Sequence, residues 1–349
     1  MTGTRYRRGL VVGKFCPLHL GHELLIRRAQ AGCDELVVLS YTQPGYAGYG
    51  RARRAAWLQA RFPQVACWVI DDAWLAAHFR AHGLPQPGPI PADDAPDDVH
   101  RLFCAWLLRA VVGQPVDAVF SSESYGEGFA AVLAAQFGKP VAHECVDPAR
   151  RAVPVSGTQI RRDPLACRHL IAPEVWADFV PRVAVLGGES TGKTTLARAL
   201  ASALGTSWVP EYGRELWERQ GGRLTHDDMA HIAQTQVCRE LAQAQAARGV
   251  LVCDTTPLTT LLYSLEMFGR AAPTLQQLAD RPYALTLLCA ADFAFVQDGT
   301  RRDEHFRARQ QAWYRASLQA RGVTCTELTG PVAQRVQQAC TLLRQAGLA

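Results

Sequence analysis

The sequence is poor in lysine, and its positive charge is not gathered into patches. Only three lysines, Lys14, Lys139 and Lys193, occur in 349 residues, and the net charge of +5 at pH 7 comes mostly from scattered arginines. Scattered charge of this kind does not predict a surface for nucleic acid. Lys14 and Lys193 stand in glycine-containing loops after predicted strands, where an ammonium group can meet a phosphate.

The sequence also lacks paired cysteines and long apolar runs. Its eleven cysteines contain no C-x-x-C pair, and several of them (Cys67, Cys253 and Cys289) lie in apolar stretches. This pattern indicates reduced thiols in a cytosol rather than a disulfide framework or a zinc site. The apolar run near the N-terminus covers only residues 10–12, which is too short for a signal peptide or a membrane span. We therefore expect a cytoplasmic chain with no membrane partner.

What is present predicts two α/β domains. The length suggests two domains of roughly 150 to 200 residues each. Short β-rich runs alternate with helical patterns, which predicts two doubly wound parallel sheets with helices on both faces. A boundary near Pro181 gives domains 1–180 and 181–349, with ligands expected at the carboxyl ends of the strands. The predicted strands are 10–12, 35–39, 66–70, 116–120 and 141–143, then 183–186, 207–209, 250–253, 285–288 and 324–328.

One segment, residues 83–98, is dominated by proline, glycine and aspartate. It can form neither a regular helix nor a central strand, so we expect a surface loop that leads into a helix over residues 99–112. Long loops in compact domains are often functional or disordered. The sequence leaves open whether this loop is a working lid or a solvated insertion.

A first phosphate-binding element follows the first predicted strand. It contains Gly13, Lys14, His19, Gly21 and His22, and both histidines stand at the predicted start of a helix. A helix N-terminus offers unpaired amides and the positive end of the helix dipole, and a glycine lets the backbone come close to a ligand. Although a lone histidine is more often structural, two imidazoles at this position can hydrogen-bond a polyphosphate.

A second anion-binding element lies near the end of the same domain. Ser156, Thr158 and Arg161 stand at another predicted helix start, where hydroxyls and amides can hold phosphate oxygens and the arginine adds charge. An ordinary helix cap is the alternative role for Ser156. Arg54, in the helix before the third strand, is a weaker candidate whose alternative is a solvated helix face.

The two elements together resemble the H-x-G-H and S-x-T-x-x-R motifs of the nucleotidyltransferase superfamily. The resemblance implies that a substrate phosphate attacks the α-phosphorus of ATP and that pyrophosphate leaves. Lys14, His19, His22 and Arg161 would then stabilise the developing charge together with Mg²⁺. Ser156 and Thr158 would hold phosphate oxygens.

The second domain opens with a Walker A pattern. The sequence G-x-x-x-x-G-K-T lies between an apolar strand and a helical run, which is the context that this motif requires. The loop amides cradle the phosphates of a second ATP, Lys193 reaches the β- and γ-phosphates, and Thr194 is a ligand of Mg²⁺. The residues expected at this ATP site are Gly187, Glu189, Ser190, Thr191, Gly192, Lys193, Thr194 and Thr195.

Further residues complete the predicted kinase site. Asp254 ends an apolar run and is expected to hold Mg²⁺ as a Walker B carboxylate, with helix capping as the alternative. Glu211 follows the second strand of this domain and is our candidate for the base that takes the proton from the attacking hydroxyl, a role that the sequence does not separate fully from Asp254. Arg301 and Arg302 are expected to contact the transferred phosphoryl group, with two exposed arginines of no catalytic role as the alternative.

The order of the two sites resembles the NadR family, in which a nicotinamide mononucleotide adenylyltransferase is followed by a ribosylnicotinamide kinase. The resemblance implies that the kinase acts on nicotinamide riboside, bound by Glu211, Tyr212, Arg214 and Asp254. It also implies that the first domain joins ATP to nicotinamide mononucleotide, with NAD as the product. The segments that carry the resemblance begin at Gly13, Phe120, Val146, Val155, Gly187, Glu211, Cys253 and Gln297.

Three features depart from the family pattern. Some family members begin with a helix-turn-helix repressor domain. Here only about ten residues precede the first strand, fewer than that motif needs, so we do not expect a DNA-binding regulator. Where the family has D-T-D, this chain has Asp254, Thr255 and Thr256, which is one carboxylate fewer near the metal. The loop at residues 83–98 lacks the aromatic residue expected to help hold the nicotinamide ring.

Two other functions remain open at the level of sequence. One is a nucleotidyltransferase–kinase fusion that acts on another small substrate, and the other is a regulator that senses ATP or NAD without turnover. The complete set of Lys193, Thr194 and Asp254 favours turnover, because sensing alone does not require every group for phosphoryl transfer. The oligomeric state, a homo-oligomer included, is not determined by these patterns.

Overall fold

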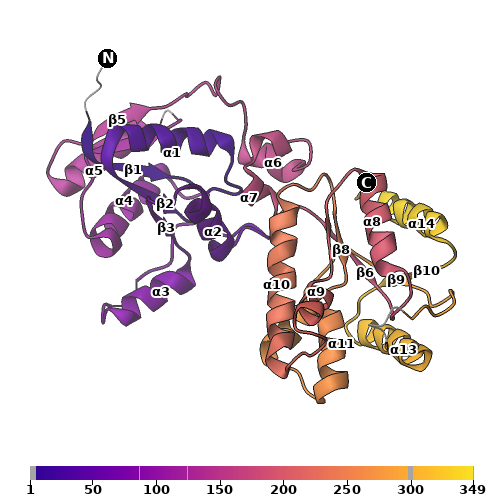
Figure 1. Ribbon diagram of the computed structural model, residues 1–349. Helices are drawn as coiled ribbons and strands as arrows, with labels where there is room; N and C mark the ends of the chain where they lie inside the picture. The colour runs from indigo at the N-terminus through magenta and orange to yellow at the C-terminus, as the bar shows by residue number, and fades with distance from the viewer. Residues whose placement is uncertain (1–4, 86, 124, 298–301, 349) are drawn as a thin grey trace. The chain divides into compact units, whose positions relative to one another are not determined.

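The computed structural model describes residues 5–85, 87–123, 125–297 and 302–348. The chain divides into two compact units, Met1–Val175 and Trp176–Ala349, and each unit is built on its own sheet (Figure 1). The division falls at the short helix α7 (Pro173–Trp176), shortly before the boundary that the sequence suggests near Pro181.

The first unit contains a five-stranded parallel sheet with the order β3-β2-β1-β4-β5. Every predicted strand of this half is present, although β1 begins at Tyr6 rather than at Leu10, because Tyr6 already pairs with Cys33 of β2. The strand order reverses between β1 and β4, where doubly wound sheets bind their ligands. The strands are β1 (Tyr6–Val12), β2 (Cys33–Ser40), β3 (Ala66–Val69), β4 (Ala118–Ser121) and β5 (Ala142–Cys145).

Helices connect the strands of this first sheet and cover it (Figure 1). Leu10, Val37 and Val119 point into one core, together with Phe79 of α3 and Leu133 of α5. The helix expected over residues 99–112 is present as α4 followed by a π-helical turn over Leu108–Val112. The α-helices are α1 (Leu20–Gly32), α2 (Arg51–Arg61), α3 (Asp72–Ala81), α4 (Asp97–Leu107), α5 (Gly126–Phe137) and α6 (Gly157–Arg162), with a 3-10 turn at Arg168–Leu170.

The second unit contains another five-stranded parallel sheet, with the order β10-β9-β6-β8-β7. Its central strand β6 carries the Walker A loop at its carboxyl end. All five strands coincide with predicted runs, and the prediction of two doubly wound α/β units is therefore confirmed. The strands are β6 (Arg182–Leu186), β7 (Trp208–Val209), β8 (Leu251–Asp254), β9 (Leu285–Cys289) and β10 (Cys325–Leu328).

Alternate residues of β6 enter two different cores, as the two-residue period of a strand requires. Val183 and Val185 pack with α8 and α14, whereas Ala184 and Leu186 pack with α9 to α13. The sheet is therefore covered on both faces. The helices are α8 (Lys193–Leu204), α9 (Tyr212–Arg219), α10 (His226–Ala244), α11 (Pro257–Phe268), α12 (Pro273–Ala279), α13 (Glu304–Ala320) and α14 (Val332–Gln345).

Two further observations concern the chain as a whole. All eleven cysteines are free thiols, and nine of them lie in strands or helices. Among the residues that the structure describes, no helix combines the length and the apolar character needed to cross a bilayer.

Candidate functional sites

The H-x-G-H element lies where β1 passes into α1. Gly13 leaves the strand with its N–H bonded to Leu39 O at 3.1 Å, and the helix begins at Leu20, with His19 as its N-cap. The Nδ1 atom of His19 accepts the backbone N–H of His22 at 3.3 Å. A Cβ on Gly21 would lie 3.2 Å from the His19 ring and 3.2 Å from Val155, so Gly21 also makes room for the histidine itself.

The two histidines form one buried pair. Their rings are stacked with centroids 3.6 Å apart, and Phe15 packs edge-on against His22 at 5.0 Å. Burial, together with the charge of Arg150, lowers the pKa of His19 to about 4. Burial, and then the neighbouring His19, lower the pKa of His22 well below its usual value. Both rings are therefore neutral at pH 7 and act as hydrogen-bonding groups. Lys14, Arg150 and Arg161 are among the cationic side chains that line this cavity.

The S-x-T-x-x-R element packs directly onto the first motif. Ser156 caps α6 by accepting the Gln159 N–H at 3.2 Å, as its alternative reading anticipates. Arg161 donates to Cys16 O at 2.5 Å and to Thr158 Oγ1 at 3.0 Å. The two motifs, more than a hundred residues apart in sequence, are thus joined by direct contacts.

Both elements line one cavity of about 670 Å³. Lys14 Nζ forms an ion pair with Asp93 Oδ2 at 2.9 Å, and Asp93 belongs to the loop at residues 83–98. The described part of that loop is attached to the unit: Ile90 is 3% exposed, and its N–H donates to Asp72 Oδ1 at 2.8 Å. The loop therefore contributes a packed edge and a carboxylate to the first site. The predicted residues that line the cavity are Gly13, Lys14, His19, Gly21, His22, Ser156, Thr158 and Arg161.

The sequence indicates some residues of this site only weakly and others not at all. Arg54 is only 2% exposed, so the solvated helix face considered for it is wrong; its guanidinium donates to Lys14 O at 3.0 Å and to Ser40 Oγ at 2.7 Å. Arg150, with a positive φ of 50°, lines the cavity near both histidines. Aromatic side chains from outside the 83–98 loop also line the cavity. Tyr41, Tyr46 and Tyr125 lie along the cavity.

The Walker A loop has the backbone geometry that binds phosphate. Gly187 and Gly192 have positive φ values of 146° and 78°, and Ser190 also has a positive φ of 57°. Thr191 Oγ1 and Lys193 Nζ both donate to Gly188 O, at 2.8 Å and 2.9 Å. The lysine therefore points back over its own loop, beside the first turn of α8, where Thr195 is also exposed.

Asp254 ends β8 next to this loop, and its surroundings suit Mg²⁺. Thr194 Oγ1 donates to Asp254 Oδ2 at 2.6 Å, and Asp254 is 1% exposed. Its other oxygen, Oδ1, is buried and accepts no hydrogen bond within the part of the chain that the structure describes. A buried carboxylate oxygen needs a partner, and one or two carboxylates plus substrate phosphates is the usual protein environment of Mg²⁺. Over the same described ranges no group of three or more His, Cys, Asp or Glu side chains is placed to hold a metal ion.

The turn after Asp254 is strained. Thr255 has a φ of 70°, a left-handed conformation that β-branched residues rarely adopt, and Thr256 caps α11 by accepting the Leu258 N–H at 3.2 Å. The position where the family has its second aspartate is thus a helix cap in this chain. The alternative role considered for Asp254, capping of the next helix, is therefore filled by Thr256 instead.

Glu211 is half-buried and immediately precedes α9. Burial raises its pKa, while the nearby charges of Lys193 and Arg214 oppose the rise. A carboxylate with a raised pKa is a better proton acceptor. Tyr212 is 5% exposed, and its hydroxyl contacts His231 Nε2 at 3.1 Å, so its ring belongs to the core of this unit while Arg214 is exposed.

Glu189 and Ser190, two of the residues predicted for the ATP site, accept backbone hydrogen bonds from the segment that precedes α13. Glu189 Oε1 accepts the Tyr263 hydroxyl at 2.9 Å, and Glu189 Oε2 accepts the Arg302 N–H at 2.8 Å. Ser190 Oγ accepts the Val296 N–H at 2.9 Å. The Arg302 guanidinium lies over the Phe306 ring at 4.4 Å. Arg301 lies outside the described residues.

Comparisons with known proteins agree with this two-part organisation. A family model described as an AAA domain matches residues 182–335. The chain is 30% identical over 307 residues to the trifunctional NAD biosynthesis/regulator protein NadR of Escherichia coli (strain K12), and 31% identical over 305 residues to the protein of the same name from Salmonella typhimurium (strain LT2). Each alignment covers 84% of this chain and 71% of the relative.

Solved structures show the same fold over the whole chain. The crystal structure of NadR protein in complex with NAD and AMP-PNP matches with a TM-score of 0.71 at 21% identity, covering 99% of this chain and 98% of that one. The crystal structure of NadR protein in complex with NR matches with a TM-score of 0.71 at 22% identity, covering 100% of this chain and 98% of that one. From the sequence relatives and the shared fold together, this chain belongs to the NadR family.

Proposed function

We propose that this chain makes NAD from nicotinamide riboside in two ATP-dependent steps, one in each unit. The second unit (Trp176–Ala349) phosphorylates the riboside to nicotinamide mononucleotide. The first unit (Met1–Val175) then transfers the adenylyl group of a second ATP to the mononucleotide, and NAD and pyrophosphate are the products. The observation that carries the proposal is the presence, in one NadR-family chain, of two separate sites. One is a Walker A loop beside a buried carboxylate oxygen that accepts no hydrogen bond from any described residue, and the other is a histidine-lined cavity.

In the kinase step the 5′-hydroxyl of the riboside attacks the γ-phosphorus of ATP, the bond from that phosphorus to the β,γ-bridging oxygen breaks, and ADP leaves. Glu211, whose pKa burial raises, takes the hydroxyl proton. Lys193 turns from Gly188 O to the β- and γ-phosphates, and the loop amides hold the β-phosphate. Thr194 and Asp254 would hold Mg²⁺, which when bound compensates the negative charge of the phosphates.

In the adenylyl step a phosphate oxygen of the mononucleotide attacks the α-phosphorus, and the bond to the pyrophosphate group breaks. Lys14, Arg150 and Arg161 line the cavity as cations, and neutral His19 and His22 can donate or accept hydrogen bonds at the start of α1. No covalent intermediate is needed, since positioning and fixed charge supply the stabilisation. Tyr41, Tyr46 and Tyr125 give the cavity aromatic surface for the pyridine and adenine rings.

The relatives support the choice of substrates. Two curated relatives are named as NAD biosynthesis proteins, and the solved structures were obtained with NAD, AMP-PNP and NR. The direct test is to incubate the purified chain with ATP, Mg²⁺ and nicotinamide riboside and to identify the products by mass. We expect the mononucleotide first and NAD afterwards.

The same incubation, repeated with other nucleosides in place of the riboside, decides between the alternatives. Phosphorylation of a different nucleoside, with no mononucleotide, would overturn the riboside assignment and leave the kinase chemistry intact. ATP binding without any product would indicate a sensor. Supplying nicotinamide mononucleotide directly tests the adenylyl step independently of the kinase.

A further inference from the structure

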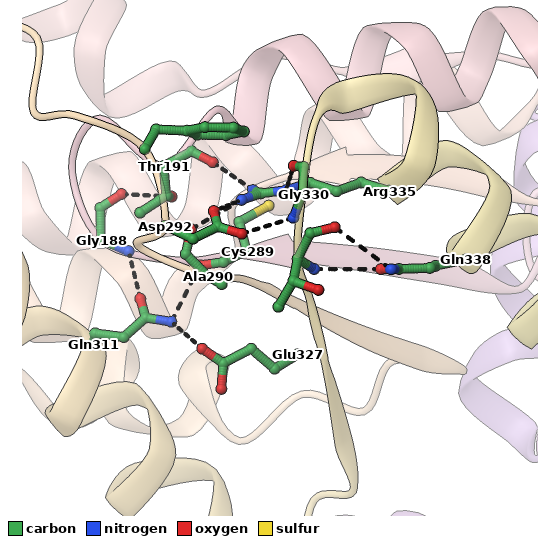
Figure 2. Close-up of polar contacts among 12 residues, drawn as sticks. Gly188, Thr191, Cys289, Ala290, Asp292, Gln311, Glu327, Gly330, Arg335 and Gln338 are labelled. Atoms are coloured by element: carbon green, nitrogen blue, oxygen red, sulfur yellow. Dashed lines mark hydrogen bonds and ion pairs between the residues drawn. The ribbon is translucent and has the colours of Figure 1, made fainter.

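A single buried arginine on the last helix connects three loops at the carboxyl edge of the second sheet. Arg335, on the first turns of α14, is 1% exposed. Its Nη1 donates to Thr191 O at 2.8 Å, its Nη2 to Ala290 O at 3.1 Å, and its Nε to Gly330 O at 2.8 Å (Figure 2). The three acceptors belong to the Walker A loop, the loop after β9 and the loop after β10.

The contact with Thr191 has a consequence for the phosphate-binding amides. In a trans peptide the C=O and the following N–H point in opposite directions. Because Arg335 holds Thr191 O toward α14, the N–H of Gly192 is turned the other way, toward the inside of the loop. Gly192 is also the residue whose φ of 78° allows this turn.

Two other backbone N–H groups of the loop already donate hydrogen bonds to side chains of α13. Gly188 N–H donates to Gln311 Oε1 at 3.2 Å, and Glu189 N–H donates to Gln310 Oε1 at 2.7 Å. Figure 2 shows Gln311 bridging the loop to Cys289 O and Glu327 as well. The start of the loop is thus held by α13, while its second half, which contains the amides nearest to Lys193, is held by Arg335.

The charge of Arg335 is compensated locally. Its Nη2 pairs with Asp292 Oδ1, and Asp292 Oδ2 accepts the Gly330 N–H at 2.6 Å. The guanidinium also lies over the Phe293 ring at 4.4 Å. Because Asp292 neutralises its charge, Arg335 influences the Walker A loop mainly by fixing the direction of its hydrogen bonds and less by adding positive charge. Only the planar guanidinium fork can satisfy these acceptors together, so lysine is not an equivalent replacement.

We propose that Arg335 is a positioning residue for ATP in the second unit, one that keeps the Gly192 amide aimed at the β-phosphate through the Thr191 carbonyl. The role rests on the proposed kinase function of this unit. It predicts that loss of the fork weakens ATP binding at this site and leaves the other ATP site of the same chain untouched.

The test is Arg335→Lys in the full-length chain. We expect the KM for ATP in riboside phosphorylation to rise about 10- to 100-fold, the effect of losing one or two charge-assisted hydrogen bonds. The KM for the riboside and the adenylyl-transfer rate should change little. A P-loop amide binds ATP in the ground state and in the transition state alike, so the KM should change more than kcat. If Arg335→Lys does not fold, Arg335→Gln, which keeps one planar donor group, takes its place.

Matched controls separate positioning from general stability. Leu343→Ala removes a fully buried side chain of the same helix, away from the loop, and Arg344→Lys makes the same chemical change at an exposed position. Leu343→Ala should lower Tm yet keep the KM for ATP. An unchanged KM in Arg335→Lys would overturn the proposal, as would an equal rise in Leu343→Ala at the same loss of Tm.

A binding measurement keeps the proposal separate from the kinase assignment. Binding of MgADP is measured by calorimetry in the wild type, in Lys193→Ala and in Arg335→Lys. Lys193→Ala weakens the Walker A site, so the binding that it retains measures the contribution of the site in the first unit. A wild type that binds MgADP through Lys193 but phosphorylates no riboside contradicts the proposed function alone. Wild-type affinity in Arg335→Lys contradicts the role of Arg335 alone.

Discussion

Thr194 Oγ1 donates a 2.6 Å hydrogen bond to Asp254 Oδ2, which joins the first turn of α8 to the end of β8. The register of the sheet creates this contact, because β8 pairs with β6 so that Asp254 stands opposite Val185, just before the Walker A loop. The hydroxyl proton is used by the carboxylate, which leaves the oxygen lone pairs of Thr194 free for a cation. The strained Thr255 then turns the chain away, and the carboxylate remains at the edge of the sheet.

The pair predicts the effect of Asp254→Asn. The amide keeps the size of the side chain and removes its charge, so riboside phosphorylation should fall by about 100-fold or more, as for loss of a metal-holding charge. The Mg²⁺ concentration for half-maximal rate should rise. Asp280→Asn, the same change at an exposed position of this unit, is the control. A wild-type rate and Mg²⁺ dependence in Asp254→Asn would show that the carboxylate does not serve the metal.

Lys193→Ala should remove the phosphoryl-transfer activity without unfolding the loop. Thr191 Oγ1 still donates to Gly188 O when the lysine is absent, so that carbonyl keeps a partner. We expect a loss of at least about 100-fold in riboside phosphorylation, because a preorganised positive charge on the transferred group is missing. Adenylyl transfer to supplied mononucleotide serves as the internal control. Collapse of both activities in a folded variant would contradict two independent sites.

His22→Ala should lower adenylyl transfer by about 10² to 10³, the range for removing one preorganised donor. The ring is stacked on His19 and lines the cavity at the start of α1, where it can form a hydrogen bond to a phosphate. The effect should fall on kcat with little change in ATP affinity, while riboside phosphorylation stays near the wild-type rate. A variant that melts several degrees lower but transfers adenylyl at the normal rate would make His22 a structural residue.

The titration of His19 gives a test that does not depend on activity. Its pKa is about 4 in the folded chain, against 6.5 when unperturbed, because it is buried and faces Arg150. The unfolded chain therefore takes up this proton first as the pH falls. The stability that His19 contributes is present above pH 6.5 and is lost toward pH 4, at up to about 1.4 kcal/mol per pH unit.

NMR titration of the imidazole signal, assigned with His19→Asn, measures this pKa directly. We expect the signal of a neutral ring down to pH 5, and a higher pKa when MgATP is added, because a nearby anion favours the charged form. Titration near 6.5 without nucleotide would mean that the ring is solvated, contrary to its 5% exposure.

The parts of both sites that the sequence predicts well are those made by contiguous residues. A Walker A loop binds phosphate with the backbone of one short segment, so the pattern of glycines from Gly187 to Gly192 is visible without the fold. The helix start at His19 is visible in the same way. The strands are also predictable, because strands buried on both faces of a parallel sheet form continuous apolar runs in the sequence. Where strand ends differ, as at Tyr6, the cause is pairing with a neighbour that a single run cannot show.

The partners of each site residue, in contrast, depend on contacts between distant segments. Nothing in the local sequence distinguishes Arg54, which supports the Lys14 carbonyl, from the exposed Arg53 beside it. Arg335 contacts Thr191 across 144 residues, and Asp93 contacts Lys14 from a loop that the sequence leaves open as a lid or a solvated insertion. The sequence by itself thus determined the two sheets, the two phosphate-binding loops and the residue types at their ends. Only the tertiary structure decided which side chains hold those loops in place and which rings are neutral, because burial and long-range hydrogen bonds arise when the sheets bring separate loops to one edge.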